Sequence, residues 1–402
     1  MNPNSHISSI ILPGSKSISN RLLMIKAIGQ LEFEIENCSD SDDTQLLKKA
    51  LEDIASGKLE INIHHAGTNM RFLCSFLSLL ENKTSILTGS EHLKQRPIKD
   101  LVDALTQLGS AIEYVEKEGF PPLKITGKKL SGNQIEVNAN VSSQFITSLL
   151  LIAPQFSNGL TIKLVGQLVS PSYITLTIEL MKSFGIEVEW KQDTISVGPS
   201  SYQINQTSIY NESDWSAASY FYSAIALGKC ESLELTGLNK QSLQPDSKVA
   251  DIFLNLGVKT EFLDHKVILT KITSNSTSFK YDFTDCPDIA QTLAVTCVGL
   301  GLKAEFTGLQ TLKIKETDRI VALKTELEKC EATIEITNNS LNITDFSSSD
   351  KNKTVTIQTY NDHRMAMSFA PLSFLYPNLK IDNKDVVSKS FPNFWNEFSK
   401  CM

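Results

Sequence analysis

Arginine is scarce in this sequence. Only five of its 38 basic residues are arginine and the rest are lysine, so lysine serves as the general surface cation. A planar guanidinium binds phosphate or carboxylate through two parallel hydrogen bonds, which an ammonium group does not reproduce. All five arginines lie in or beside short motifs that precede apolar helical patterns, so we expect them to converge on an anion site. They are Arg21, Arg71, Arg96, Arg319 and Arg364.

The chain also lacks the features of membrane-spanning, secreted and metal-binding proteins. No apolar run has transmembrane length, and residues 1–9 lack the basic and apolar parts of a secretory signal. Seven cysteines show no CxxC or paired spacing, so we expect small buried apolar side chains rather than disulfides or a zinc site. The net charge of −7 argues against a nucleic acid partner. We expect a cytoplasmic protein with no metal ion.

The first motif, at residues 12–21, predicts a helix that starts on a basic, serine-rich turn. Pro13 and Gly14 interrupt what precedes them, and apolar residues then recur at helical spacing until Gly29. Unpaired N–H groups and the positive end of the helix dipole at such a start attract phosphate or carboxylate. The alternative is a capped amphipathic helix whose cations, among them Lys16, face solvent.

An internal repeat of helix, glycine and alternating strand runs through the chain. Its register marks are Gly109, Gly185, Gly257 and a degenerate position at Glu331, with spacings of 76, 72 and 74 residues. Each copy is typical of a helix that ends at its glycine and is followed by a strand. At 402 residues the chain has room for two domains and five or six such units.

Junctions like the first one recur along the chain, at residues 66–71, 142–144, 313–319 and 361–364. Together with the opening Leu-Pro-Gly-Ser-Lys-Ser…Asn-Arg, the motifs Lys-Glu-Thr-Asp-Arg and Asn-Asp-His-Arg-Met-Ala-Met closely resemble the 5-enolpyruvylshikimate-3-phosphate (EPSP) synthase family over residues 12–394. The resemblance implies an α/β (α+β) fold of two similar lobes, each of three βαβαββ repeats with helices inside and sheets outside. The lobes would be residues 15–211, mainly for shikimate 3-phosphate, and residues 1–14 with 212–402, for acid–base chemistry and part of the phosphoenolpyruvate site.

The resemblance also implies the reaction: transfer of the enolpyruvyl group of phosphoenolpyruvate to shikimate 3-phosphate, without a cofactor, through a tetrahedral intermediate. The expected acid–base residues are Asp288, Lys315 and Glu316, with His363 in a supporting role near the phosphate. Phosphoenolpyruvate would be bound by Lys16, Gly67, Arg96, Arg319, Arg364 and Lys389. Shikimate 3-phosphate would be bound by Lys16, Ser17, Arg21, Ser142, Ser143, Gln144, Ser170, Tyr173, Asp288, Thr311 and Lys315.

Simpler roles stay open for several of these residues taken singly. Ser142 and Ser143 suit helix capping, as does Asp288 after Pro287, and Glu316 suits a structural salt bridge. Asp318 and Asp362 are expected to orient Arg319 and Arg364 rather than to react.

Three positions depart from the family's pattern: Thr311 replaces an asparagine, and His65 and Phe72 flank the Gly67 turn. We expect a monomer that is inhibited by glyphosate at the phosphoenolpyruvate site. The alternatives are a UDP-N-acetylglucosamine enolpyruvyl transferase, whose typical cysteine before Arg96-Pro97 is missing here, and a non-catalytic anion-binding relative.

Overall fold

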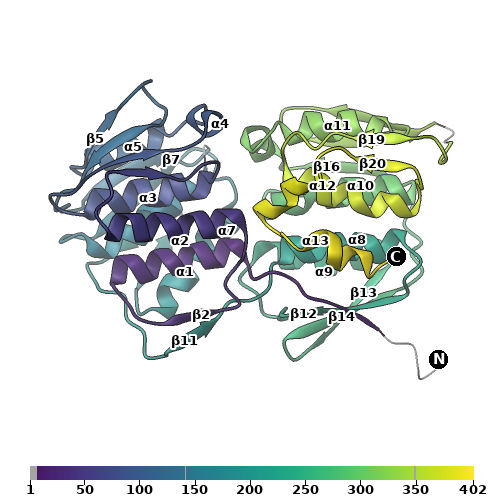
Figure 1. The fold of residues 1–402 in the computed structure, drawn as a ribbon, viewed down its shortest axis with the longest axis horizontal. Coiled ribbons are helices and arrows are strands. Elements are labelled where there is room, and N and C mark those ends of the chain that lie inside the picture. Colours follow the sequence, from purple (N-terminus) through teal and green to yellow (C-terminus); the bar gives the residue numbers. More distant parts are fainter. Residues whose placement is uncertain (1–6, 141, 348–349) are drawn as a thin grey trace. The chain divides into compact units, whose positions relative to one another are not determined.

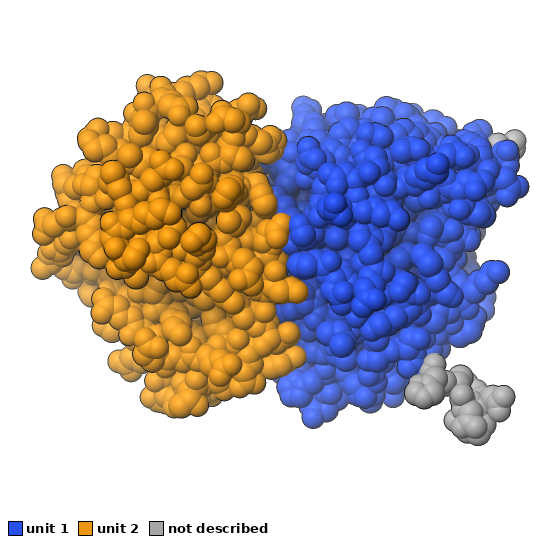
Figure 2. Space-filling view, viewed as in Figure 1, with its two compact units in different colours: residues 1–15, 212–402 blue, residues 16–211 orange. Residues whose placement is uncertain are grey.

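The computed structural model describes residues 7–140, 142–347 and 350–402, and the chain divides into two compact units. Unit 1 comprises Met1–Ser15 and Glu212–Met402, and unit 2 comprises Lys16–Asn211 (Figure 2). The expected lobes place the first boundary one residue earlier, and residues 1–6 of the expected second lobe lie outside the described residues. Each unit has its own hydrophobic core.

Unit 2 contains two four-stranded sheets and one parallel pair of strands (Figure 1). The first sheet has the order β3-β4-β6-β5 and consists of Glu60–Asn62, Thr84–Thr88, Leu123–Thr126 and Ala111–Tyr114. The second has the order β7-β8-β10-β9 and consists of Gln134–Asn138, Leu160–Val165, Thr194–Val197 and Val188–Lys191. The pair joins β2 (Glu34–Glu36) to β11 (Ser208–Tyr210). The helices are α1 (Lys16–Gly29), α2 (Asp42–Ala55), α3 (Gly67–Leu79), α4 (Glu91–Lys94), α5 (Lys99–Gln107), α6 (Ser143–Ile152) and α7 (Pro171–Ser183).

Unit 1 repeats this plan. One sheet has the order β1-β12-β14-β13 and consists of Ser8–Ile10, Ser232–Thr236, Lys266–Lys271 and Val258–Leu263. The other has the order β15-β16-β18-β17 and consists of Ser278–Asp282, Lys303–Thr307, Leu341–Phe346 and Ala332–Ile336. The pair joins β19 (Val355–Ile357) to β20 (Leu379–Ile381). The helices are α8 (Trp215–Leu227), α9 (Val249–Leu254), α10 (Ala290–Leu300), α11 (Arg319–Glu328), α12 (His363–Phe369) and α13 (Phe394–Ser399).

Burial shows why helices are inside and sheets outside. Nine of the ten residues of α6 and twelve of the thirteen residues of α8 are buried, as expected for helices that are packed on all sides. The strands alternate instead: β7 and β16 have every second residue buried, so one face meets the core and the other meets solvent. The expected two-lobed α/β architecture is confirmed.

The internal repeat is visible in the backbone. Gly109, Gly185 and Gly257 follow α5, α7 and α9, and each has a positive φ, of 99°, 80° and 89°. Glu331 takes the same place after α11 with φ 65°, a conformation that costs a residue with a Cβ more than glycine. The next strand begins within three residues in all four copies. The predicted helix, reversal and strand are confirmed, including the degenerate copy.

Buried hydroxyl groups join the helices of neighbouring repeats. Ser75 on α3 contacts Ser148 on α6, and Ser219 on α8 contacts Thr292 on α10, each across 73 residues of sequence. Thr292 also contacts Ser368 on α12. These pairs satisfy polar groups where helices pack together, so the same device is used in both units.

The cysteines are all free. Five are buried as expected, whereas Cys38 and Cys230 are only half-buried, so the prediction of buried side chains is wrong for these two. Cys230 lies two residues before β12 and Cys38 two residues after β2, next to the ends of strands, where burial is incomplete. Among the described residues, no helix is long and apolar enough to cross a membrane.

Candidate active site

The start of α1 carries Lys16, Ser17 and Arg21, as the first motif predicts. Lys16 Nζ lies 3.1 Å from Asp43 Oδ2. Arg21 is buried and donates to the carbonyl oxygens of Ser17 and Tyr173 and to the Thr177 hydroxyl. Burial lowers the pKa of Arg21 to about 10, because neutral partners do not repay the desolvation of its charge. An anionic ligand at this helix start would offset that cost.

Arg96 packs directly against the backbone of Gly67 at the start of α3. A Cβ built on Gly67 would lie 2.4 Å from Arg96 Nη1 and 2.9 Å from its Cζ, so only glycine leaves the guanidinium in place. Arg71, one turn further on, donates to the carbonyl oxygens of Gly67 and Pro97. Two of the five arginines therefore meet at one glycine, and Arg71 has a structural role there.

The predicted shikimate 3-phosphate residues of the later junctions lie at two other helix starts. Ser142 caps α6: its Oγ accepts from the N–H of Gln144, whose side chain donates to Thr68 Oγ1. The capping expected for Ser142 is thus present. Ser143 is buried on the first turn of α6. Ser170 precedes α7 in a left-handed conformation, with φ 52°, and Tyr173 is half-buried on that helix.

In unit 1, Arg319 is the centre of a cluster of ion pairs. Its side chain is 2% exposed, and it bonds Asp362 through Nε at 2.7 Å and Nη2 at 3.2 Å. Nη2 also lies 2.9 Å from Glu316 Oε2, and Nη1 lies 3.4 Å from Asp288 Oδ1. Desolvation lowers the pKa of Arg319, but the three carboxylates together raise it above its ordinary value. The guanidinium is therefore a permanent cation in the cluster.

Glu316 bridges two cations. Its Oε1 accepts from Lys389 Nζ at 2.6 Å, and its Oε2 accepts from Arg319. Lys389 is buried at the end of a short 3-10 turn, Asp385–Lys389. The expected salt bridge exists and is compatible with a chemical role as well, because the two cations hold the carboxylate in one orientation.

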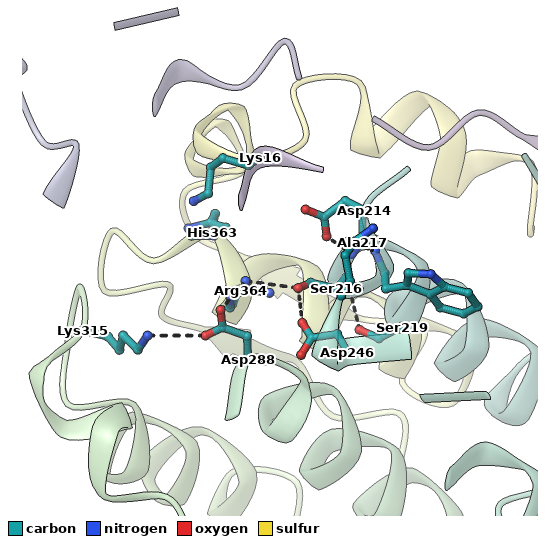
Figure 3. A network of polar contacts seen from close by, with 12 residues as sticks. Lys16, Asp214, Ser216, Ala217, Ser219, Asp246, Asp288, Lys315, His363 and Arg364 are labelled. Atoms are coloured by element: carbon teal, nitrogen blue, oxygen red, sulfur yellow. Dashed lines mark hydrogen bonds and ion pairs between the residues drawn. The ribbon is translucent and has the colours of Figure 1, made fainter. Parts of the chain in front are cut away.

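Asp288 stands among three cations, at the start of the 3-10 turn Pro287–Ile289 that leads into α10. Figure 3 shows two of them, Lys315 and Arg364, beside its carboxylate. Its Oδ2 lies 3.0 Å from Arg364 Nη2, and its Oδ1 lies 3.7 Å from Lys315 Nζ and 3.4 Å from Arg319. Desolvation is the largest influence on Lys315 and lowers its pKa. Lys315 therefore gives up its proton more readily than an exposed lysine does.

Asp318 and Asp362 do not share the orienting role that the sequence predicts. Asp318 caps α11 by accepting from the N–H groups of Ile320 and Val321, so the expectation that it orients Arg319 is wrong. Asp362 orients Arg319 and caps α12 through the N–H of Arg364, whose guanidinium is held by Asp288 instead. Each of these aspartates caps the helix that carries its neighbouring arginine. A carboxylate from another segment also binds each guanidinium, Asp362 for Arg319 and Asp288 for Arg364.

Two further predicted residues also lie in unit 1. His363 is buried at the start of α12, with Nδ1 3.7 Å from Asp362 Oδ1. Thr311 lies in the 3-10 turn Gln310–Ile314, and its buried Oγ1 has no hydrogen-bond partner among the described residues. Within residues 7–140, 142–347 and 350–402, no three His, Cys, Asp or Glu side chains are placed so that they could bind a metal ion.

Sequence reasoning missed Ser216 and Tyr220, whose hydroxyl groups accept from Arg364, and Asp246, which accepts from Ser216. A signal for Asp246 existed. Pro245-Asp246 begins a 3-10 turn, Pro245–Lys248, in the same way that Pro287-Asp288 begins the turn that carries a predicted site residue.

Comparison with known proteins is consistent along the whole chain. The family model described as EPSP synthase (3-phosphoshikimate 1-carboxyvinyltransferase) matches residues 2–62 and 50–398. The 3-phosphoshikimate 1-carboxyvinyltransferase of Bacteroides fragilis (strain YCH46) is 47% identical over 399 residues, covering 99% of this chain and 96% of the relative. That of Shewanella halifaxensis is 35% identical over 426 residues, covering 99% and 98%.

Solved structures share the fold at low identity. EPSP synthase from Acinetobacter baumannii matches with a TM-score of 0.72 and 20% identity, covering 99% of this chain and 97% of that one. The enolpyruvyl transferase NikO from Streptomyces tendae matches with a TM-score of 0.70 and 14% identity, covering 99% and 95%. At these identities the likeness establishes the architecture alone.

Proposed function

The chain belongs to the EPSP synthase family, and we propose that the clusters around Lys16, Arg96 and Arg319 are its substrate and catalytic sites. The enzyme transfers the enolpyruvyl group of phosphoenolpyruvate to the 5-hydroxyl of shikimate 3-phosphate and releases phosphate, a step of aromatic amino acid biosynthesis. The observation that carries the site proposal is the juxtaposition of Asp288 and Glu316 with four buried or half-buried cations.

Unit 2 supplies the proposed shikimate 3-phosphate site. The hydroxyl and amide groups suit a polyol ring, and the buried Arg21, which lacks a carboxylate partner among the described residues, suits its phosphate. The residues are Lys16, Ser17, Arg21, Ser142, Ser143, Gln144, Ser170 and Tyr173, with Asp288, Thr311 and Lys315 from unit 1. We assign phosphoenolpyruvate to Lys16, Gly67, Arg96, Arg319, Arg364 and Lys389.

The proposed chemistry has two steps. In the addition, a base takes the proton of the 5-hydroxyl, its oxygen bonds to C2 of the enolpyruvyl group, and an acid protonates the methylene carbon to give a tetrahedral ketal phosphate. In the elimination, the methyl carbon loses a proton, the C2–O bond to phosphate breaks and the enol ether forms. We assign these transfers to Asp288, Lys315 and Glu316, with His363 supporting the phosphate. Lysine and arginine meet the phosphate charge, so we propose no cofactor.

Exchanging the acceptor tests the function. We expect phosphate release from phosphoenolpyruvate with shikimate 3-phosphate, and none above background with UDP-N-acetylglucosamine or without an acceptor. A colorimetric phosphate assay measures all three mixtures. Release with UDP-N-acetylglucosamine would contradict the proposal in favour of the related transferase.

We further propose that the enzyme works as a cytoplasmic monomer.

Replacing Gly67 by alanine tests the Arg96 assignment and the proposal that glyphosate competes with phosphoenolpyruvate. The added methyl group displaces the Arg96 guanidinium. We therefore expect KM for phosphoenolpyruvate to rise up to about tenfold, less than complete loss of a hydrogen bond to a charged group would cause. Glyphosate is the longer molecule with less clearance, so its inhibition constant should rise more. Initial rates with phosphoenolpyruvate varied at saturating shikimate 3-phosphate give both constants.

Gly198→Ala is the matched control, because a Cβ at Gly198 has no atom within 4 Å. It should leave both constants unchanged. Equal losses for the two ligands in Gly67→Ala would refute the clearance argument, and unchanged constants would refute the contact with Arg96.

A further inference from the structure

A buried carboxylate, Asp246, is connected to Arg364 through Ser216 and has no part in the chemistry described above. It stands at the start of the turn Pro245–Lys248 and is 3% exposed. Its Oδ2 accepts a hydrogen bond from the Ser216 hydroxyl, and its Oδ1 has no hydrogen-bond partner among the described residues. A buried carboxylate with one bond is costly, so its position calls for a reason other than folding.

Ser216 links this carboxylate to the proposed site. Its single hydroxyl proton is donated to Asp246, and its oxygen therefore accepts from Arg364 Nη2 at 3.3 Å (Figure 3). A hydroxyl has one proton and two lone pairs, so engaging the proton fixes the side that faces the guanidinium.

Arg364 is thereby held from several directions. Nη2 also donates to Asp288 Oδ2 at 3.0 Å, and Nη1 donates to the buried Tyr220 hydroxyl at 3.4 Å. Ser216 and Tyr220 both lie on α8, one turn apart, so one rigid helix presents both acceptors. The contact through Ser216 continues to a second buried carboxylate, that of Asp246.

Two carboxylates and one cation act on the charge of Asp246. Desolvation, followed by the nearby carboxylate of Asp288, raises the pKa of Asp246 to about 7, while Arg364 and the Ser216 bond lower it; Asp214 adds a smaller upward effect. Asp246 in turn raises the pKa of the Cys286 thiol, after desolvation. Arg364 is the cation that faces Asp246, and Ser216 is the group between them.

We propose that Asp246 is a positioning residue for the transfer: through the Ser216 hydroxyl it fixes the direction of the Arg364 guanidinium, and so sets the affinity for phosphoenolpyruvate. The proposal rests on the assignment of Arg364 to phosphoenolpyruvate made above. It adds a role for two residues that do not touch the substrate.

Ser216→Ala is the first test. Removing a hydrogen bond to a charged group should raise KM for phosphoenolpyruvate about tenfold or more, with kcat and KM for shikimate 3-phosphate within about twofold. Ser216→Thr keeps the hydroxyl and should restore KM. Ser223→Ala is the matched control, because Ser223 is a buried serine of α8 whose hydroxyl bonds Thr296 instead. It should leave all three constants unchanged.

A double-mutant cycle separates a relay from two independent effects. Asp246→Asn should raise KM for phosphoenolpyruvate as Ser216→Ala does, and the double variant should be no worse than Ser216→Ala alone. Multiplying effects would overturn the relay. Thermal unfolding of each variant shows whether it is folded, and rescue by Ser216→Thr decides the matter if Asp246→Asn is not.

Arg364→Lys distinguishes failure of this proposal from failure of the site assignment. We expect its KM for phosphoenolpyruvate to rise, because lysine loses the guanidinium fork. An unchanged KM in Arg364→Lys would overturn the assignment and the relay with it. A raised KM in Arg364→Lys beside an unchanged KM in Ser216→Ala would overturn the relay alone.

Discussion

Glu316→Gln is expected to lower kcat by about 10²- to 10⁴-fold, the usual contribution of a positioned acid–base group. The substitution keeps the shape of the side chain and removes its charge. Shikimate 3-phosphate should still bind, because its proposed ligands lie mainly in unit 2. Steady-state rates, together with titration calorimetry of shikimate 3-phosphate, measure the two effects separately.

The competing interpretation is that Glu316 only neutralises Lys389 and Arg319. In that case Glu316→Gln would lower thermal stability and leave the folded enzyme near its normal kcat. KM for phosphoenolpyruvate should not rise in Glu316→Gln. Without the negative charge of Glu316, Lys389 and Arg319 attract the anionic substrate at least as strongly as before.

Glu326→Gln is the matched control for a buried carboxylate in the same unit. Glu326 on α11 accepts from the Tyr360 hydroxyl and the N–H of Gln358 and is paired with Lys329. None of these groups belongs to the proposed site, so the control should cost stability and keep kcat. A normal kcat in both variants would contradict the catalytic role of Glu316.

Helix starts and the internal repeat could be predicted from the sequence because their causes are local. Gly109 and its counterparts mark positions where the chain must reverse with a positive φ, and Glu331 is recognised only through its spacing from them. The junctions at Lys16 and Gly67 combine chain breakers, basic residues and an apolar period in a few residues, and each starts a helix as predicted.

Ion-pair and hydrogen-bond partners from distant segments could not be predicted in this way. Asp318 is next to Arg319 in sequence but accepts from the helix backbone, and Asp362, 43 residues away, binds the guanidinium. A capping geometry competes for the carboxylate that sequence proximity suggests as a partner. The link from Asp246 to Arg364 was missed for the same reason, because it depends on how α8 packs beside the turn at Pro245.

Arg319→Lys is expected to lower the free energy of unfolding of unit 1 by about 3–5 kcal/mol, the usual cost of breaking a buried ion pair from one side. Arg319 satisfies Asp362 with two bonds and reaches Glu316 and Asp288 as well. A single ammonium group does not span these positions, so at least one buried carboxylate is left unpaired. Activity should fall with it, because Glu316 loses one of its two cations.

Urea unfolding followed by tryptophan fluorescence measures this in one unit. The chain has three tryptophans, and in a Trp190→Phe background the remaining Trp215 and Trp395 both lie in unit 1. Asp362→Asn should destabilise the wild type but restore part of the loss in Arg319→Lys, since it removes the carboxylate that has lost its partner. Additive losses of stability in the double variant would contradict a direct pairing of Arg319 with Asp362. A loss below about 1 kcal/mol for Arg319→Lys would mean that its ion pairs stabilise unit 1 no more than exposed pairs do.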